Sequence, residues 1–569
     1  MNDHCNADLP TTSRRASFLG KIPTFFIKHR HLWAMICGGS LTGLTVIFPQ
    51  IGLAEWVTLI PMLYAFYRLC EGTAISGKRA YCYGFFAVFS YNLVIYHWFL
   101  KMHPMDFVGL TNEESLFVVI LGWLGLSLLQ ALPGGLIFWF YRWLNQHNTF
   151  THFPWLPLLV FPALWTVLEW ISTIGWTGVP MGRLALGQIQ CLPMLQSASL
   201  LGSYFISFLI LLVNSLLAYA FCFEKKRAVC GITAAAIVLV SFGFGLARMG
   251  IRKNVVYKDE AYFSVAVIQG NLSVYESWDS GSYYLMKRVH ADLTRQAVKD
   301  GAQLVIWPET TFPYDLSESA DLRLFSSNLA RECGVPIVIG ALDSDDDGND
   351  YNVLYYVEEN GTIREETYIK RRLVPFGEYV PMGDLFSILL PPLADMMALG
   401  AGLTAGEEPY CFDTEWGSAG ALICYDSIYE PLTRDSVLNG AEWIMIASND
   451  SWFRNSAAVD LHQAQAQLRA IESGRYVASA VNTGISSLIS SEGEILEWLD
   501  KDTDGYAIAK LISREDRTLY MSVGNLFVYL CISLGIAAFG CGFYAKRKER
   551  GRVSLTQADE EVHEENSSS

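Results

Sequence analysis

Residues 418–426 read Ser-Ala-Gly-Ala-Leu-Ile-Cys-Tyr-Asp, and this stretch decides the fold of the second half of the chain. The apolar run from 419 to 424 predicts a buried strand that ends at Cys424. A nucleophile at a strand end, on a sharp turn, is exposed and can use nearby backbone N–H groups as an oxyanion hole. An inert cysteine in the core is the alternative interpretation of the same pattern.

Further apolar, β-branched runs lie on both sides of this strand. They cover residues 263–268, 304–307, 336–340, 443–447 and 477–481. Segments with helical periodicity lie between several of them, at 283–299, 322–332 and 461–473. The turn residues Asn360-Gly361 join 353–358 to 362–367 and predict a hairpin. This alternation of strand and helix patterns predicts an α/β domain.

The composition shows that a membrane part accompanies this domain. The 569 residues are 51% apolar and only 17% charged, against about 25% charged residues in an average soluble protein. Such a chain is not intrinsically disordered, and a single soluble globule is not expected. Spans are predicted at residues 32–50, 53–70, 81–99, 116–144, 157–173, 198–222, 229–249 and 521–545. The interrupted apolar segment 176–197 is predicted to be a loop or a re-entrant piece.

The distribution of charge predicts the topology. Residues 258–518 contain 42 acidic and 19 basic residues, a net charge of −23, whereas the rest of the chain is net +7. When eight spans are drawn, most lysines and arginines of the short connections fall on one side, which is predicted to be cytoplasmic. Both termini then lie inside and the acidic block outside, with Arg248, Arg252 and Lys253 on the disfavoured side. The net charge of −16 argues against nucleic-acid binding.

The chain is therefore predicted to have five parts. These are a cytoplasmic N-terminal segment (1–31), a membrane domain of about seven helices (32–249), the α/β domain (258–518), a C-terminal transmembrane helix (521–545) and a cytoplasmic tail (546–569).

Two charged residues of the α/β domain stand in unusual surroundings. Glu309 follows the apolar strand 304–307 and Pro308, an apolar setting that suits a general base. Lys370 begins three consecutive cations beside the apolar turn Leu-Val-Pro-Phe, and a lysine near a reacting carbonyl can stabilise an oxyanion. The alternative for Glu309 is a surface acid in a loop. The alternative for the cations is a phosphate-facing or solvated charge, and this interpretation is kept for Arg371 and Arg372.

The cysteines give no support to a zinc site. Of the 12 cysteines, only Cys333, Cys411 and Cys424 lie in the α/β domain, and neither a C-x-x-C motif nor a Cys/His cluster with zinc spacing occurs. A disulfide framework is not expected, although a Cys333–Cys411 bond in an oxidising compartment stays open. No metal and no cofactor are predicted.

Three motifs together resemble the signatures of the nitrilase superfamily. They are Trp307-Pro-Glu-Thr310, the lysine ahead of Leu373-Val-Pro-Phe-Gly-Glu-Tyr-Val-Pro381, and Ile423-Cys-Tyr425. Within that superfamily the chain resembles the bacterial apolipoprotein N-acyltransferase family, also through residues 448–453, through Asn482-Thr-Gly484, and through the order of seven spans, outer domain and final span. The resemblance implies a multi-span α-helical membrane domain and an extracytoplasmic α/β domain that folds as an αββα sandwich.

The resemblance also implies which residues form the site. Cys424 would be the nucleophile, Glu309 the base and Lys370 the oxyanion stabiliser. The supporting or substrate-binding residues implied by the family are Trp278, Glu378, Tyr425 and Asp426. At the last position the family usually has glutamate, so the shorter aspartate moves the carboxylate by about 1.5 Å, one carbon–carbon bond.

The implied reaction is a ping-pong acyl transfer. A membrane phospholipid would donate an acyl chain to Cys424, and the thioester would then acylate the α-amino group of the diacylglyceryl-modified N-terminal cysteine of an apolipoprotein. The implied location is the bacterial inner membrane, with the catalytic domain on the periplasmic side. The apolar segment 381–406 is expected either to guide acyl chains as a mobile arm or to pack on the domain's own core.

Two other functions remain open at this point. A membrane-tethered amidase or other hydrolase of the nitrilase type would let water resolve the acyl-enzyme. A transporter with an accessory outer domain is the third possibility. It is disfavoured because charged residues inside the spans are scarce, and Glu55 and Glu169 have no obvious basic partners in the sequence.

Overall fold

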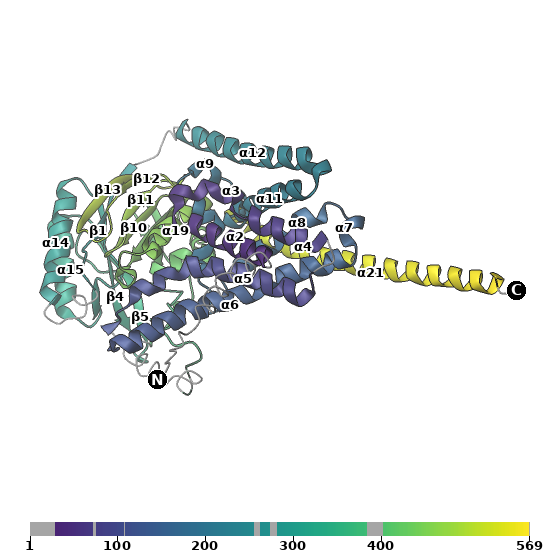
Figure 1. Ribbon diagram of the computed structural model, residues 1–569. Helices are drawn as coiled ribbons and strands as arrows, with labels where there is room; N and C mark the ends of the chain where they lie inside the picture. Colours follow the sequence, from purple (N-terminus) through teal and green to yellow (C-terminus); the bar gives the residue numbers. More distant parts are fainter. Residues whose placement is uncertain are drawn as a thin grey trace, which may run out of the picture.

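The computed structural model places a helical unit and a two-sheet unit side by side (Figure 1). It describes residues 29–71, 75–106, 109–254, 262–273, 282–383, 388 and 402–567. The predicted arm 381–406 lies mostly outside these residues, and so does Trp278.

Two sheets pack face to face in the second unit. The first has the strand order β13-β1-β2-β4-β5-β6, with β3 paired to β4, and the second has the order β12-β11-β10-β9-β8-β7. The strands are β1 (Tyr262–Gln269), β2 (Leu304–Ile306), β3 (Phe312–Asp315), β4 (Ile337–Ser344), β5 (Asp350–Val357), β6 (Tyr368–Ile369), β7 (Cys411–Thr414), β8 (Gly417–Ile423), β9 (Trp443–Ser448), β10 (Val477–Val481), β11 (Ser487–Ile489), β12 (Ile495–Trp498) and β13 (Gly505–Ile512).

Helices cover the outer faces of both sheets. On the first sheet lie α14 (Tyr283–Lys299) and α15 (Ala320–Cys333), whose buried side chains form one apolar cluster with those of β1, β2 and β4. On the second sheet lie α18 (Glu430–Leu438) and α19 (Ala457–Ser473). A dry layer that includes Val267, Ile306 and Ile423 fills the space between the sheets. This arrangement is the αββα sandwich.

The sequence predicted the central strands and missed the edges. All six predicted apolar runs form strands, namely β1, β2, β4, β8, β9 and β10, and α14, α15 and α19 lie where helices were expected. The second arm of the predicted hairpin differs, because only an isolated bridge joins Val357 to Ile363 and β6 then contributes two residues. Short edge strands such as β7 and β12 are partly exposed and carry no continuous apolar run, so periodicity does not identify them.

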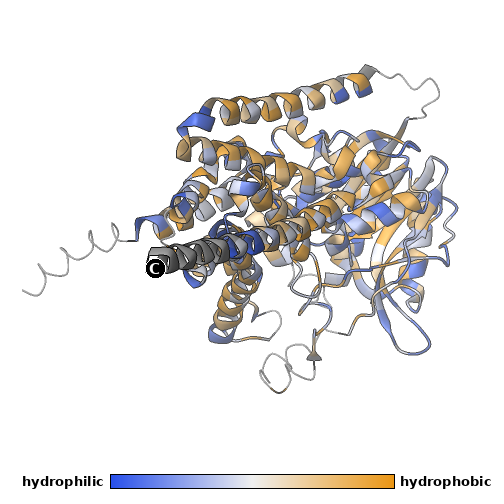
Figure 2. Ribbon diagram, turned by 90° about the vertical axis from the view of Figure 1, so that its right-hand side faces the viewer, coloured by the Kyte–Doolittle hydropathy of each residue, from blue (hydrophilic) through white to orange (hydrophobic). Residues whose placement is uncertain are grey.

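The helical unit contains a helix for each predicted span. The helices are α2 (Arg30–Ile47), α3 (Glu55–Thr58) with α4 (Ile60–Glu71), α5 (Gly77–Ile95), α6 (Asn112–Gln146), α8 (Leu156–Ile171), α11 (Ser203–Cys222), α12 (Arg227–Asn254) and α21 (Leu526–Ser567). Among the described residues, four helices are long and apolar enough to cross a membrane by themselves: α6, α11, α12 and α21. The count of eight spans therefore stays a prediction. Figure 2 shows α12 apolar along most of its length.

The segment 176–197 forms a compact strap between the two units. It contains the short turns η4 (Pro180–Gly182), η5 (Leu184–Gln188) and α9 (Leu192–Leu195), and the side chains of η5 are fully buried. Prolines at the starts of η4 and α9 and the glycines between them prevent a long helix. A loop or re-entrant piece was predicted here, and the turns agree with that prediction.

A buried ionic network joins the strap to the two-sheet unit. Arg183 of the strap contacts Glu430 at the start of α18 at 3.0 Å, and both side chains are 1% exposed. The Tyr204 hydroxyl of α11 donates to the same carboxylate at 2.6 Å. Breaking a buried pair of this kind typically costs about 3–5 kcal/mol, because one charge is left uncompensated. The two units are therefore expected to behave as one body.

Two of the cations on the disfavoured side of the topology contact polar partners, and those of Arg252 are acidic. Arg252, near the end of α12, contacts Glu492 at 3.3 Å and Asp516 at 2.7 Å. Arg248 donates to the side-chain oxygen of Gln196. Contacts with the acidic domain offset the positive charge at this end of α12, which accounts for the exception to the lysine and arginine bias.

Candidate active site

Cys424 stands on a strained turn where β8 ends. Its φ angle is 48°, in the left-handed region that non-glycine residues rarely occupy, and the short helix η8 (Cys424–Ile428) begins at this residue. Such strain gathers at functional sites, where the surrounding structure holds it. The expectation of an exposed thiol was wrong: Cys424 is 8% exposed, because α19 and the neighbouring strands pack around the turn.

Glu309 lies at the end of β2 and reaches the same site. Its backbone passes so close to β4 that a Cβ at Gly340 would meet the Pro308 carbonyl oxygen at 2.3 Å, so glycine is required there. The carboxylate is 6% exposed and accepts the Asn449 N–H at 2.9 Å. The end of β2 thus positions a buried carboxylate beside Cys424.

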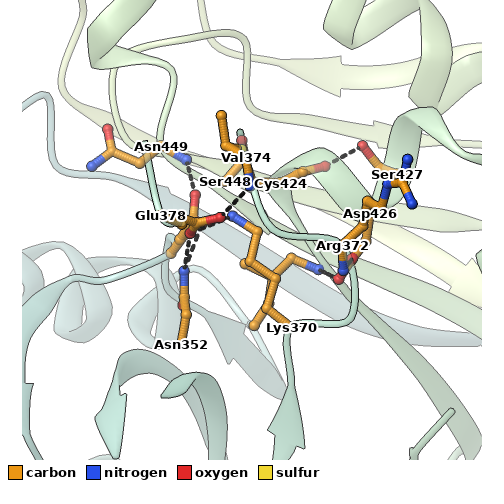
Figure 3. Close-up of polar contacts among 12 residues, drawn as sticks. Asn352, Lys370, Arg372, Val374, Glu378, Cys424, Asp426, Ser427, Ser448 and Asn449 are labelled. Carbon is orange, nitrogen blue, oxygen red and sulfur yellow. Dashed lines mark hydrogen bonds and ion pairs between the residues drawn. The ribbon is translucent and has the colours of Figure 1, made fainter. Parts of the chain in front are cut away.

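Lys370 follows β6 and lies between two carboxylates. Its Nζ donates to Glu309 Oε1 at 2.7 Å and to Glu378 Oε1 at 2.8 Å, while the side chain is 1% exposed (Figure 3). Glu378 also accepts the Val374 N–H at 2.8 Å, which fixes its carboxylate. Glu378 lies only eight residues after Lys370, whereas Glu309 is 61 residues away and reaches the lysine only through the fold.

Asn352 is a member of this site that the sequence did not reveal. Its amide on β5 donates to Glu309 at 2.8 Å and to Glu378 at 3.1 Å, and it is 2% exposed. It thus bridges the two carboxylates, and in Figure 3 it lies on the side of Glu378 away from Cys424. The one available signal was a polar residue immediately before the apolar run 353–358, which is too common a feature to identify a site residue.

The charges of the site set the protonation of its members. Burial by itself would lower the pKa of Lys370, but the carboxylates of Glu309 and Glu378 outweigh it and hold that pKa well above its ordinary range. Burial, and then the charge of Glu309, raise the pKa of the Cys424 thiol well above its ordinary value, and Lys370 only partly opposes them. The resting site therefore holds a neutral thiol beside a permanent ammonium.

The residues after Cys424 bind the turn to its surroundings. Asp426 Oδ2 accepts the Ile423 N–H at 3.0 Å, and Oδ1 accepts the Arg372 N–H at 2.7 Å. The shorter aspartate still reaches both donors, and burial raises its pKa to about 6. The Tyr425 hydroxyl donates to the Gly178 carbonyl of the strap at 3.0 Å. Both residues thus contact the backbone around the site, and Tyr425 ties it to the membrane unit.

Arg371 and Arg372 are not simply solvated charges. Arg371 contacts Asp435 at 3.0 Å. The Arg372 guanidinium donates to the Gly175 carbonyl at 2.6 Å and lies 4.6 Å from the centre of the Tyr429 ring. Both cations therefore brace the segment that carries Lys370.

The other cysteines of the domain do not enter the site. Cys333 and Cys411 are free, so the open question of a bond between them is answered in the negative for this structure. Within the described part of the chain, no group of three or more histidine, cysteine, aspartate or glutamate residues has metal-binding geometry.

Two family models match the chain. The carbon-nitrogen hydrolase model matches residues 264–517, and the model of the apolipoprotein N-acyltransferase N-terminal domain matches residues 38–216. The apolipoprotein N-acyltransferase of Geobacter metallireducens is 27% identical, over 90% of this chain and 95% of its own length. That of Gloeobacter violaceus is also 27% identical, over 91% and 94%. That of Vibrio cholerae is 29% identical, over 78% and 84%.

Solved structures that match part of the chain include members of the nitrilase superfamily. An amidase from Nesterenkonia sp. AN1 is 17% identical, over 47% of this chain and 98% of its own, with a TM-score of 0.35. Nit3 of Saccharomyces cerevisiae is 21% identical, over 44% and 90%, with a TM-score of 0.35.

Proposed function

Because the chain belongs to the apolipoprotein N-acyltransferase family, we propose that Cys424, Glu309 and Lys370 carry out the family's reaction here. The protein is an acyltransferase of lipoprotein maturation. Its donor is a membrane phospholipid, and its acceptor is the α-amino group of the diacylglyceryl-modified N-terminal cysteine of an apolipoprotein.

In the first half-reaction, Glu309 takes the proton of the Cys424 thiol as the sulfur attacks the ester carbonyl. The negative charge that develops on the carbonyl oxygen is stabilised by the Lys370 ammonium, which the two carboxylates keep protonated. The C–O bond then breaks and Glu309 returns the proton to the departing lysophospholipid hydroxyl. A thioester on Cys424 is the product.

In the second half-reaction, the α-amino group of the acceptor attacks the thioester. Glu309 takes a proton from the attacking nitrogen, and the oxyanion again forms beside Lys370. The C–S bond breaks, the amide leaves, and the sulfur recovers a proton from Glu309. A thioester suits this step because it reacts readily with amines.

The membrane arrangement supports an extracytoplasmic site. The buried contact between Arg183 and Glu430 puts the strap that follows α8 on the same side as the catalytic unit. We propose the bacterial inner membrane as the location, with the catalytic unit periplasmic and both termini cytoplasmic. Substrates anchored in the outer leaflet then meet a site that is itself held at the bilayer surface.

One observation carries the assignment: a lysine ammonium lies enclosed between two carboxylates beside a strained cysteine, in a unit whose helix α19 packs into the membrane helices. A solvated surface cation would have neither the burial nor the two partners. Trp278 stays a proposed substrate-binding residue from the family resemblance.

The test uses the full-length protein in detergent micelles with phospholipid carrying a labelled acyl chain. Wild type should gain one acyl group by intact mass, through a bond that hydroxylamine cleaves, and Cys424→Ala should gain none. Cys333→Ala is the matched control, because Cys333 is also a free cysteine of the catalytic unit, and it should label as wild type does. Labelling of Cys424→Ala would overturn the assignment.

The same experiment separates the transferase from the hydrolase. If the labelled acyl group stays on the protein until an amine-bearing lipopeptide is added, the enzyme transfers it. If free fatty acid appears at the same rate without the lipopeptide, water resolves the thioester and the protein is a hydrolase.

A further inference from the structure

A chain of buried polar groups lies directly behind the turn that carries Cys424. His462 on α19 contacts Asp450 through Nδ1 at 2.9 Å and Ser427 Oγ through Nε2 at 2.9 Å. The Ser427 hydroxyl in turn donates to the backbone carbonyl of Cys424 at 2.7 Å. The exposed fractions of Asp450, His462 and Ser427 are 2%, 6% and 0%. None of these three residues has a part in the reaction as proposed above.

The hydrogen-bond inventory fixes the direction of this chain. A serine hydroxyl has one proton, and Ser427 gives it to the Cys424 carbonyl. The proton between His462 Nε2 and Ser427 Oγ must then come from the imidazole, and Nε2 also lies 3.2 Å from the same carbonyl oxygen. Nδ1 faces Asp450 Oδ1, so both ring nitrogens act as donors. The arrangement is that of an imidazolium paired with a carboxylate.

The charged groups around His462 agree with that state. Burial by itself would lower the pKa of His462, but Asp450 outweighs it, and Glu309 acts in the same direction, so the pKa is raised. Asp450 also accepts the Ser448 hydroxyl at 3.1 Å, which holds its carboxylate at the end of β9.

The Cys424 carbonyl accepts these hydrogen bonds, and its direction determines where the Tyr425 N–H points. In a trans peptide the C=O and the following N–H lie in one plane and point in opposite directions. Holding the Cys424 carbonyl on the α19 side therefore aims the Tyr425 N–H away from α19. Tyr425 lies in the first turn of η8, where backbone N–H groups have no partner within the helix.

We propose that Asp450, His462 and Ser427 are positioning residues that lock the peptide plane between Cys424 and Tyr425, so that the Tyr425 N–H joins Lys370 in binding the oxyanion. This inference rests on the proposed function. What it adds is a role for the three residues behind the turn, which orient that N–H through the Cys424 carbonyl. It also accounts for the strain at Cys424, because two donors on one carbonyl hold a backbone conformation that the residue alone would leave.

The test compares two reactions of the same sulfur. Acylation by phospholipid passes through an oxyanion, whereas alkylation by iodoacetamide displaces iodide and forms none. Ser427→Ala should slow acylation by at least about tenfold, approaching the roughly 10²–10³-fold loss typical of a missing oxyanion donor. Alkylation of Cys424 should keep the wild-type rate. Ser436→Ala is the matched control, a buried serine that also donates to a backbone carbonyl but lies in α18, and it should change neither reaction.

His462 supplies a second set of variants. His462→Ala should slow acylation more than Ser427→Ala, and His462→Gln should recover part of the loss, because its amide can donate where Nε2 does. Parallel loss of acylation and alkylation would mean that the chain of contacts only shapes the turn, and unchanged acylation would mean that it has no role. Either result would overturn the proposal while wild-type acylation still supports the transferase. If wild type formed no acyl-enzyme, the proposed function itself would be refuted.

Discussion

The ammonium of Lys370 holds two buried carboxylates together, and removing it should have separable effects on stability and on catalysis. In Lys370→Met, Glu309 and Glu378 lose contacts of 2.7 and 2.8 Å and share only the Asn352 amide. Without the ammonium between them, the two carboxylates repel each other in a buried site. Loss of one partner from a buried ionic group costs about 3–5 kcal/mol.

This cost should appear as a large fall in the melting temperature. The catalytic unit has about 250 residues between β1 and β13, a size for which 1 kcal/mol shifts Tm by about 2–4 °C. We therefore expect Lys370→Met to melt about 10 °C below wild type. The double variant Lys370→Met/Glu378→Gln removes one cation and one anion, and its amide oxygen still accepts the Val374 N–H. It should regain at least half of the lost Tm.

Activity should not follow stability in this pair. Neither variant has the oxyanion donor, so both should form acyl-enzyme about 10²–10³-fold more slowly than wild type. The assay is Tm by thermal denaturation in micelles, beside the rate of label transfer to Cys424. If the double variant melts no higher than Lys370→Met, the two carboxylates are not coupled through the lysine. If Lys370→Met acylates at the normal rate, the lysine has no catalytic role.

Four further predictions concern the nucleophile, the base, the pH dependence of the thiol and the topology. Cys424→Ser should still insert in the membrane but lose turnover, since a hydroxyl is far harder to ionise than a thiol; near-normal turnover would refute the assignment. Glu309→Gln should slow acyl-enzyme formation by about 10²–10⁴-fold, and a rate within a few-fold of wild type would exclude it as the base. Burial, and then Glu309, raise the pKa of Cys424 above its ordinary 9.0. The thiolate fraction therefore grows only at alkaline pH, and alkylation of wild type by iodoacetamide should accelerate through pH 9. A rate that reaches its plateau below pH 7 would contradict the raised pKa. A reporter inserted near Asp346 should be external and one fused after Arg552 cytoplasmic, and the reverse pattern would place the site on the wrong face.

The central strands, and the positions of Glu309 and Cys424 at strand ends, followed from local patterns in the sequence. A strand buried on both faces is a continuous apolar run, and β8 and β9 are buried along almost their whole length. Because the chemistry is placed where such runs end, Glu309 and Cys424 stood out by position. The family resemblance then joined them to Lys370, which no spacing rule connects to either residue.

The partners of these residues depended on pairings between distant segments. Asn352 reaches Glu309 only because β5 pairs with β4, and β4 passes close behind the end of β2. The sequence does not specify which strands pair, because several of its apolar runs could equally well form neighbouring strands. The exposure of Cys424 was misjudged for the same reason, because α19 covers the turn from 38 residues further along the chain.

The sequence by itself determined the division into membrane and α/β parts, the central strands and the residues able to do chemistry, because burial and reactivity leave composition signals that span only a few neighbouring residues. Only the tertiary structure decided how the two units join through Arg183 and Glu430, and that His462 and Ser427 lie behind Cys424. These are buried polar groups, and their energy depends on partners within hydrogen-bond distance. Such partners are brought together by the packing of distant segments, and no local pattern records that packing.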